Sequence, residues 1–205
     1  MDGIGEAILA RLDAKNGCRE AVLAQSRHAV QHAARAIRAA HRADWDEAEA
    51  ILAGGGEIMQ AMQAAARGHA DLQSAGYMLD AQKELAEAHL TLALLRDRPL
   101  PGPEQLGVAD AAWLNGLGEA AGELRRAALD AIRLGRIADA EALLERMQEI
   151  HTYLSTVDYP AAITLNLKRT NDMVRGVTER TRGDLTVAVG QAELKAALAR
   201  VEAGL

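Results

Sequence analysis

Apolar side chains recur every three or four residues along most of this 205-residue chain. Two runs show the spacing well: Val30, Ala33, Ala34, Ile37 and Ala40, and later Leu114, Leu117, Ala121, Leu124, Ala128 and Ile132. This period places one side of an α-helix against a core, whereas a half-buried strand needs alternating apolar and polar residues. No alternating run of useful length is present, so the pattern predicts an all-α protein.

Proline and glycine positions divide the chain into eight predicted helices. We expect them at residues 2–15, 17–42, 44–67, 70–97, 109–134, 137–154, 160–181 and 184–202, with the third loosened at Gly54-Gly55-Gly56. The prolines lie only at 99, 101, 103 and 160, and a proline inside a helix costs about 3 kcal/mol. Short connections favour antiparallel neighbours. We therefore expect one antiparallel helical domain spanning residues 1–205.

Helix ends carry their own signals. Asn16 can cap the second predicted helix, and Asp44 can cap the third, with Glu47 at the spacing of a capping box. Gly135 can end the fifth through a left-handed cap. Gly183-Asp184 is expected to divide the last two helices.

Composition narrows the class of protein further. Aromatic residues make up only 2% of the chain, which suits a helical core of alanine and leucine better than a β-protein. The net charge of −6 argues against a uniformly basic nucleic-acid coat but allows a local basic patch. The single Cys18 predicts a reducing, cytoplasmic location. Residues 1–6 do not resemble a signal peptide, and no apolar run is long enough to predict a membrane span.

Two predicted helices carry carboxylates three or four residues apart. Asp80, Glu84 and Glu87 share a stripe on one helix, and Glu119 and Glu123 share a face on another. Like charges at these spacings repel by a few tenths of a kcal/mol per pair. If the two helices pack antiparallel, the stripes can converge on Mg²⁺ or Mn²⁺, which prefer hard oxygen ligands. Such ions can activate water and stabilise charge on a scissile phosphate.

An ordinary solvated face explains the same acids. In that interpretation Lys83–Glu87 and Glu123–Arg126 form weak surface pairs, and no metal is needed.

Basic residues form a second pattern. The predicted helix at 17–42 carries a row of four arginines, and two further basic residues precede the acidic helix: Arg27, Arg35, Arg38 and Arg42, then Arg67 and His69. Such a row can track a phosphate backbone. The alternative is a solvated face, or one that pairs with acids of another helix or subunit.

Other chemistries lack their motifs. The chain has no Glu-x-x-His pair of the di-iron type and no Walker sequence, and Cys18 has no motif of a catalytic thiol. His28 and His32 are four residues apart, but no nearby carboxylate or cysteine completes a transition-metal site.

The order of the motifs is more specific than any one of them. Along the chain come Arg35-x-x-Arg38-x-x-His41-Arg42, Tyr77-x-x-x-Ala81-Gln82-x-Glu84-x-x-Glu87-Ala88, Gly122-Glu123-Leu124-Arg125-Arg126, Asp158-Tyr159-Pro160, and Lys168-Arg169-x-x-Asp172-x-x-Arg175. Over roughly residues 20 to 195 this series resembles the translin family, and within it the prokaryotic translin-like proteins and the catalytic subunit called translin-associated factor X.

The resemblance implies an all-α bundle of about seven helices that assembles into a closed shell of eight copies. It also implies binding of single-stranded RNA and DNA, and a Mg²⁺-dependent endoribonuclease site on the inner wall. The family's Gln-Glu-x-x-Glu-Ala signature looks like Gln82 to Ala88 here, with one residue inserted after Gln82. By that likeness Glu84 and Glu87 are catalytic carboxylates, and Glu119 takes the place of a third acid that is usually Asp. Leu85 stands where the family usually has an aromatic residue.

Together these features predict a homo-oligomeric single-strand-binding protein that acts as a Mg²⁺- or Mn²⁺-dependent endoribonuclease. Glu84, Glu87 and Glu119 would hold the metal, with Glu123 as an accessory ligand. The basic residues named above would hold the RNA or DNA backbone. Two alternatives stay open: a binding module without catalysis, and a helical scaffold that needs neither metal nor nucleic acid.

Overall fold

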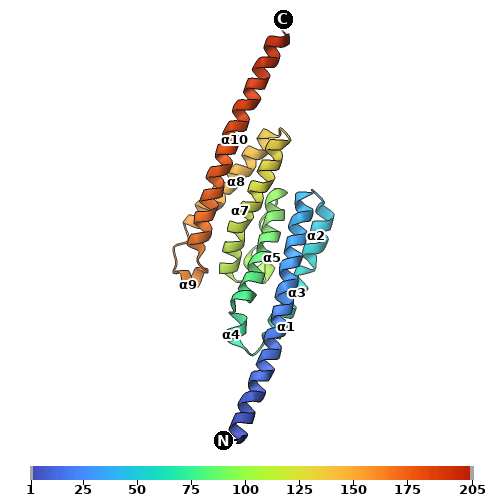
Figure 1. The fold of residues 1–205 in the computed structure, drawn as a ribbon, viewed down its shortest axis with the longest axis vertical. Coiled ribbons are helices and arrows are strands. Elements are labelled where there is room, and N and C mark those ends of the chain that lie inside the picture. Colours follow the sequence, from blue (N-terminus) through green and yellow to red (C-terminus); the bar gives the residue numbers. More distant parts are fainter. Residues whose placement is uncertain (1, 204–205) are drawn as a thin grey trace.

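All regular secondary structure in residues 2–203, which the computed structural model describes, is helical (Figure 1). The seven long helices are α1 (Asp2–His41), α2 (Trp45–Ala53), α3 (Gly55–Ala65), α5 (Gly76–Leu95), α7 (Asp110–Arg133), α8 (Ile137–Ser155) and α10 (Leu167–Ala203). The three short ones are α4 (Ala70–Gln73), α6 (Pro103–Leu106) and α9 (Ala161–Thr164). The predicted all-α bundle of about seven helices is confirmed.

Helix α5 lies at the centre of the bundle. It packs against α1 on one side and α7 on the other, while α7 also packs against α8 and α10 (Figure 1). Ala81, Leu85 and Ala88 of α5 join the core shared with α1, α2 and α3. Ala86 and Leu90 join the core shared with α7, α8 and α10. With two faces of α5 buried in apolar cores, its acidic residues are confined to the narrow stripe between them.

Two glycines of α7 allow its backbone to lie very close to its neighbours. A Cβ at Gly116 would lie only 2.8 Å from the carbonyl oxygen of Lys83 and 2.9 Å from the amide nitrogen of Glu87, both on α5. A Cβ at Gly118 would lie 2.3 Å from the side-chain methyl of Thr170 on α10. Any larger residue at these positions would push the helices apart, so Gly116 sets the spacing between the two acid-bearing helices.

Two predicted helix breaks are wrong. Helix α1 passes Asn16 without interruption, and α10 passes Gly183-Asp184 in the same way. The local signals are weak in both places, because Asn or Gly inside a helix costs no more than about 1 kcal/mol and no proline follows to stop the helix. Lys15 pairs with Asp71 at 2.5 Å beside Asn16, and Asp184 pairs with Arg125 of α7 at 2.9 Å.

Other helix ends differ in detail from the prediction. Asp44 precedes α2 but makes no side-chain capping hydrogen bond, and its carboxylate lies 4.0 Å from Arg42. Glu47, expected to complete the capping box, pairs with Arg42 at 2.6 Å. The predicted helix at 70–97 is divided into α4 and α5. The division between α2 and α3 at Gly54 and the left-handed Gly135 (φ 73°) follow the prediction.

The two ends of the described chain project from opposite ends of the bundle (Figure 1). The first half of α1 and the last part of α10 carry large apolar side chains that are mostly exposed: Ile4, Ile8, Leu9 and Leu12, and Val187, Leu194, Leu198 and Val201. None of the helices in the described part has the length and apolar character required to cross a membrane.

Candidate metal centre

Three carboxylates from α5 and α7 meet at one point. Glu84 and Glu87 come from α5 and Glu119 comes from α7, and one oxygen of each lies within 4.8 Å of the others. The two acidic stripes therefore converge. The close backbone contact at Gly116, one turn before Glu119, brings the helices near enough for this.

The expected antiparallel packing of these two helices is wrong. Helices α5 and α7 run in the same direction, since Gln82 bonds to Ala109 at the start of α7 and Leu95 borders the same hollow as Ala131 near its end.

Glu87 is the most buried of the three acids. Its side chain is 8% exposed, and it makes no hydrogen bond or ion pair with any residue that the structure describes. Burial, reinforced by the charges of Glu119, Glu84 and Glu123, raises the pKa of Glu87 to about 8. Burial also raises the pKa of Glu84. Glu87 therefore keeps its proton at neutral pH in the metal-free protein, and a cation bound beside it would favour its ionised form.

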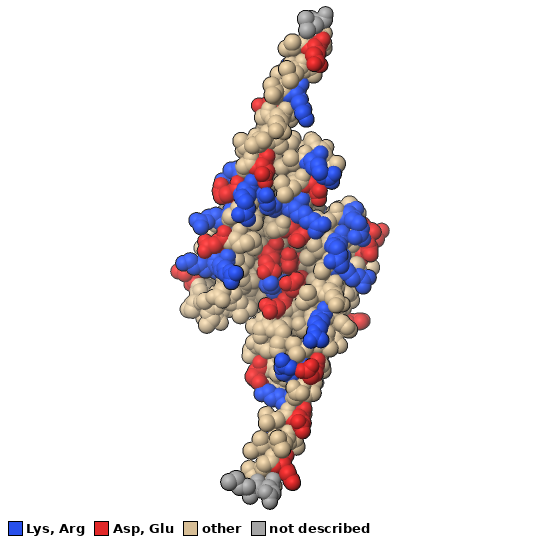
Figure 2. Space-filling view, viewed as in Figure 1, with Lys and Arg blue, Asp and Glu red and all other residues tan. Residues whose placement is uncertain are grey.

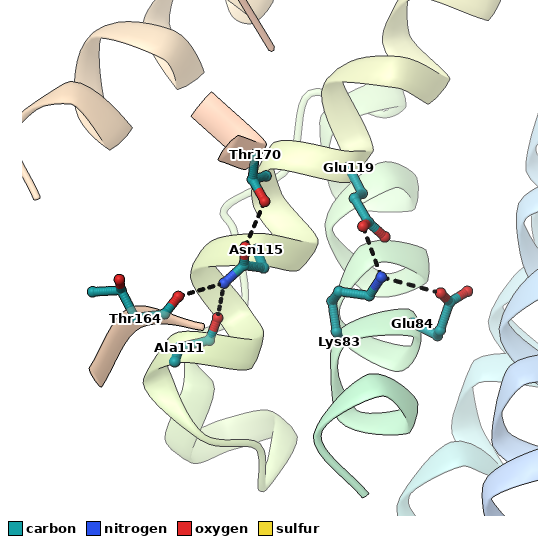
Figure 3. Close-up of polar contacts among 7 residues, drawn as sticks. All are labelled: Lys83, Glu84, Ala111, Asn115, Glu119, Thr164 and Thr170. Carbon is teal, nitrogen blue, oxygen red and sulfur yellow. Dashed lines mark hydrogen bonds and ion pairs between the residues drawn. The ribbon is translucent and has the colours of Figure 1, made fainter. Parts of the chain in front are cut away.

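Lys83 supplies one cation at the edge of the cluster (Figure 3). Its Nζ donates to Glu119 Oε1 at 2.7 Å and lies 3.5 Å from Glu84 Oε1. Burial lowers the pKa of Lys83, but the hydrogen bond to Glu119 and the charges of Glu119 and Glu84 outweigh it and leave the pKa raised. The predicted Lys83–Glu87 pair is wrong, because the lysine reaches across to α7 rather than along its own helix.

Glu123 is held apart from the other acids. It accepts a hydrogen bond from His41 Nε2, at the end of α1, and lies 3.8 Å from Arg126, the surface pair expected from the sequence. The bond from His41 lowers the pKa of Glu123, although burial acts in the opposite sense. Glu123 thus links α7 to α1 and lies outside the set of three acids, but its charge still raises the pKa of Glu87. Its expected role as an accessory metal ligand stays a prediction.

Asn115 lies on α7 one turn before Glu119, and both residues line one cavity. Its Nδ2 donates to the carbonyls of Ala111 (2.7 Å) and Thr164 (2.9 Å), and its Oδ1 accepts from the Thr170 hydroxyl at 2.6 Å (Figure 3). This buried network fixes α7 against α9 and α10. The partners on α9 and α10 could not be predicted from the sequence, because they lie far from Asn115 along the chain.

A cavity of about 360 Å³ lies beside the cluster, between α5, α7 and α10. Lys83 and Glu119 form one part of its wall, Asp80 contributes a further acid, and Arg169 of α10 also lines it. Arg169 was not among the residues expected to bind nucleic acid. The cavity gives the acid cluster an opening bordered by both signs of charge.

The predicted basic row is present on α1. Arg27, Arg35 and Arg38 are exposed and make no ion pair within the described residues. Arg42 is also exposed, but its charge is engaged by Glu47. Free, exposed arginines are available to an external anion, which favours the first three over Arg42 as phosphate contacts.

The two basic residues before the acidic helix lie elsewhere. Arg67 is exposed and borders a separate hollow of about 750 Å³ together with Gln82 and residues of α3. His69 is half-buried and directly precedes α4. Neither belongs to the α1 row.

Acidic side chains occupy the middle of the face shown in Figure 2, over α5 and α7. Lys and Arg side chains border them on both sides, over α1 and over α10 (Figure 2). The acids over α5 and α7 therefore lie between two positively charged regions, although the net charge of the chain is −6.

Comparison with known proteins identifies the fold. No family model matches the chain. An uncharacterized protein of Methanocaldococcus jannaschii, MJ0175, is 30% identical over 194 residues, covering 93% of this chain and 85% of that protein. The crystal structure of AfC3PO matches with a TM-score of 0.80 and 29% identity, over 91% of this chain and 97% of that one. The chain belongs to the translin (C3PO) family.

Two further solved structures share the fold of the chain. AfC3PO in complex with duplex RNA matches with a TM-score of 0.78 and 29% identity, over 91% of this chain and 96% of that chain. The structure of apo-NeC3PO matches with a TM-score of 0.80 over 89% of this chain and 96% of that chain, at 16% identity, and shows the same fold. The translin resemblance expected from the ordered motifs is confirmed.

The acid cluster of this translin-family chain fits a divalent ion. Mg²⁺ and Mn²⁺ prefer carboxylate oxygens, and the three acids offer oxygens close enough together to share one ion. Glu87 is buried and its carboxyl has no partner in residues 2–203, so a bound ion could balance the charge of its ionised form. The residues therefore fit the metal that the family resemblance implies.

Proposed function

We propose that this translin-family protein binds nucleic acid and cleaves single-stranded RNA at the acid cluster with Mg²⁺ or Mn²⁺. The observation that supports this most strongly is Glu87, which is buried, lacks a protein partner in the described chain and lies within 4.8 Å of Glu84 and Glu119. A purely structural cluster would be expected to give its most buried acid a hydrogen-bond partner, because a buried polar group without one is costly even when it is neutral.

Different residues would bind the metal and the nucleic-acid strand. Glu84, Glu87 and Glu119 would hold the ion, which when bound supplies charge stabilisation at a phosphate and lowers the pKa of water. Arg35 and Arg38 on α1 and Arg169 on α10 would hold phosphates on either side of the acids. The burial of Glu87 limits the water around the acids, which strengthens their attraction for a cation.

Nucleic-acid binding is supported by the charge pattern and by the family. The solved AfC3PO complex contains duplex RNA, and that structure covers 91% of this chain. The preference for single strands is our extension from the family resemblance. A salt-dependent affinity for an oligonucleotide would separate both binding hypotheses from a scaffold without nucleic acid.

We also propose that the protein works as a homo-oligomer, with eight copies as the number the resemblance suggests. The protruding parts of α1 and α10 expose rows of apolar side chains that a monomer would leave in water. Light scattering at micromolar concentration should give a mass several times 21.8 kDa, and a clean monomer would contradict the proposal. The unpaired Cys18 suits the cytoplasm, where we place the protein.

A binding module without catalysis is the second candidate. Lys83 is the observation that favours it, because its ammonium already contacts two of the three acids. In that case Lys83 would offset the negative charge of the cluster, and no metal would be needed.

A cleavage assay separates the two functions. Single-stranded RNA is incubated with the protein in Mg²⁺, in Mn²⁺ or in EDTA, and Glu84→Gln and Glu119→Gln are compared with Glu141→Gln, an exposed glutamate of α8. We expect metal-dependent cleavage that falls at least about a hundredfold in the two cluster variants, with oligonucleotide binding retained. Binding without cleavage under every condition would leave the module and remove the nuclease.

A further inference from the structure

The acid cluster contains a cation that belongs to the chain itself. The Nζ of Lys83 lies 2.7 Å from Glu119 and 3.5 Å from Glu84, and its side chain is 22% exposed. We propose that Lys83 is the resident counter-ion of the cluster and that a divalent ion must displace its ammonium in order to bind. This inference rests on the metal site proposed above and adds to it a residue that competes with the metal.

The two cations would compete for the same carboxylates. Mg²⁺ binds carboxylate oxygens at about 2.0 to 2.1 Å, and an ion held by Glu84 and Glu119 would bind the two groups whose Oε1 atoms Lys83 now contacts. The ammonium and the ion would then lie within a few ångströms of each other, and their charges would repel strongly in a half-buried site. The two cations cannot both keep their best contacts.

The structure gives the lysine side chain somewhere to go. Lys83 also lines the cavity of about 360 Å³ beside the cluster, which Arg169 borders as well. A lysine side chain has a flexible four-carbon stem, so it can turn into this space by rotation about its own bonds. Its backbone stays in place, because the carbonyl oxygen of Lys83 packs against Gly116 of α7. Displacement therefore requires no movement of a helix.

Lys83 has opposite effects on the two states of the site. Without metal, the ammonium offsets repulsion between Glu84 and Glu119 and stabilises the fold. With metal, the same contacts have to be given up, so the lysine weakens the affinity for the ion. Removing its charge should destabilise the metal-free protein and tighten metal binding at the same time, as linkage between competing ligands requires.

The test uses Mn²⁺, which substitutes for Mg²⁺ and can be followed by electron paramagnetic resonance. Mn²⁺ is titrated into full-length, metal-free wild type, Lys83→Met and Lys83→Gln, with melting curves recorded with and without the ion. Lys83→Arg keeps the charge, and Lys168→Met removes an exposed lysine charge on α10 as a matched control. We expect both neutral Lys83 variants to bind Mn²⁺ at least about tenfold more tightly and to melt lower without metal. Lys83→Arg and Lys168→Met should stay near wild type.

Each result separates the two proposals. Equal Mn²⁺ affinity in wild type and both neutral variants would overturn the role of Lys83 and leave the metal site standing. Binding only in the neutral variants would support Lys83 as the counter-ion and overturn the metal-dependent nuclease. If wild type and all variants fail to bind Mn²⁺, both proposals fail. The two neutral variants differ in shape and polarity, so a folding defect in one leaves the other to decide.

Discussion

Replacing Glu87 with Gln should change how the stability of the metal-free protein depends on pH. Burial and the neighbouring acids raise the pKa of Glu87 from 4.5 to about 8 in the folded protein. Above about pH 4.5 the unfolded chain releases this proton, whereas the folded chain keeps it until about pH 8. The unfolded state therefore binds fewer protons in that window, and the free energy of unfolding falls as pH rises.

The size of the effect follows from the same interval. Each unit of pH between 4.5 and about 8 removes about 1.36 kcal/mol of unfolding free energy, which amounts to about 5 kcal/mol across the window. Gln carries no titratable proton, so Glu87→Gln should match wild type near pH 5. It should exceed wild type by up to about 5 kcal/mol above pH 8.

Urea unfolding in EDTA at about pH 5, 6.5 and 8.5 and at one protein concentration measures this difference. Glu141→Gln, an exposed glutamate of α8, serves as the control and should show no such trend. At the highest pH, Mn²⁺ should restore stability to wild type and have little effect on Glu87→Gln, because the amide is a poorer ligand. A difference between wild type and Glu87→Gln that does not change with pH would refute the buried, unpaired state of Glu87.

Other parts of the molecule give further predictions. Replacing Arg35 and Arg38 together with Ala should weaken single-strand binding and reduce the slope of log affinity against log salt by about 1.4; an unchanged slope would show that these arginines do not face phosphate. Gly116→Ala should cost about 1 to 3 kcal/mol in urea unfolding and abolish the metal-linked rise in melting temperature, since its Cβ would meet α5; wild-type melting behaviour would contradict the close approach. Ile8→Asp and Leu198→Asp should lower the mass seen by light scattering, and an unchanged mass would exclude these ends from the subunit interface.

The acid cluster could be predicted because a helix determines locally which residues share a face. The spacing of Glu84 and Glu87 and the position of Glu119 on a second helix follow from the 3.6-residue period alone. Lys83 could not be predicted in the same way. Its local spacing suits Glu87, and only the approach of α7 at Gly116 brings Glu119 within reach.

Prediction from local sequence also failed at two expected helix ends. Asn16 and Gly183 carry ordinary signals for the ends of helices, but each lies where neighbouring side chains form ion pairs with other helices. Each residue costs a helix no more than about 1 kcal/mol, so its signal is too weak to predict by itself whether the helix ends there. At Gly54 one helix gives way to the next, and Gly135 adopts the left-handed conformation that follows the end of α7. Both glycines mark helix ends, as predicted.

The unbroken course of α1 has a consequence for how assembly and binding depend on each other. One helix carries both the exposed apolar end around Ile8 and the arginines at 35 and 38, about 45 Å apart at 1.5 Å per residue. Because α1 is one uninterrupted helix, it has no hinge between these two regions. A tilt at one end is therefore transmitted to the other. In an assembly of subunits, the angle at which neighbours dock would therefore set the orientation of the arginines. A mutation at the docking end would then change the affinity for a nucleic-acid strand that the mutated residue does not contact.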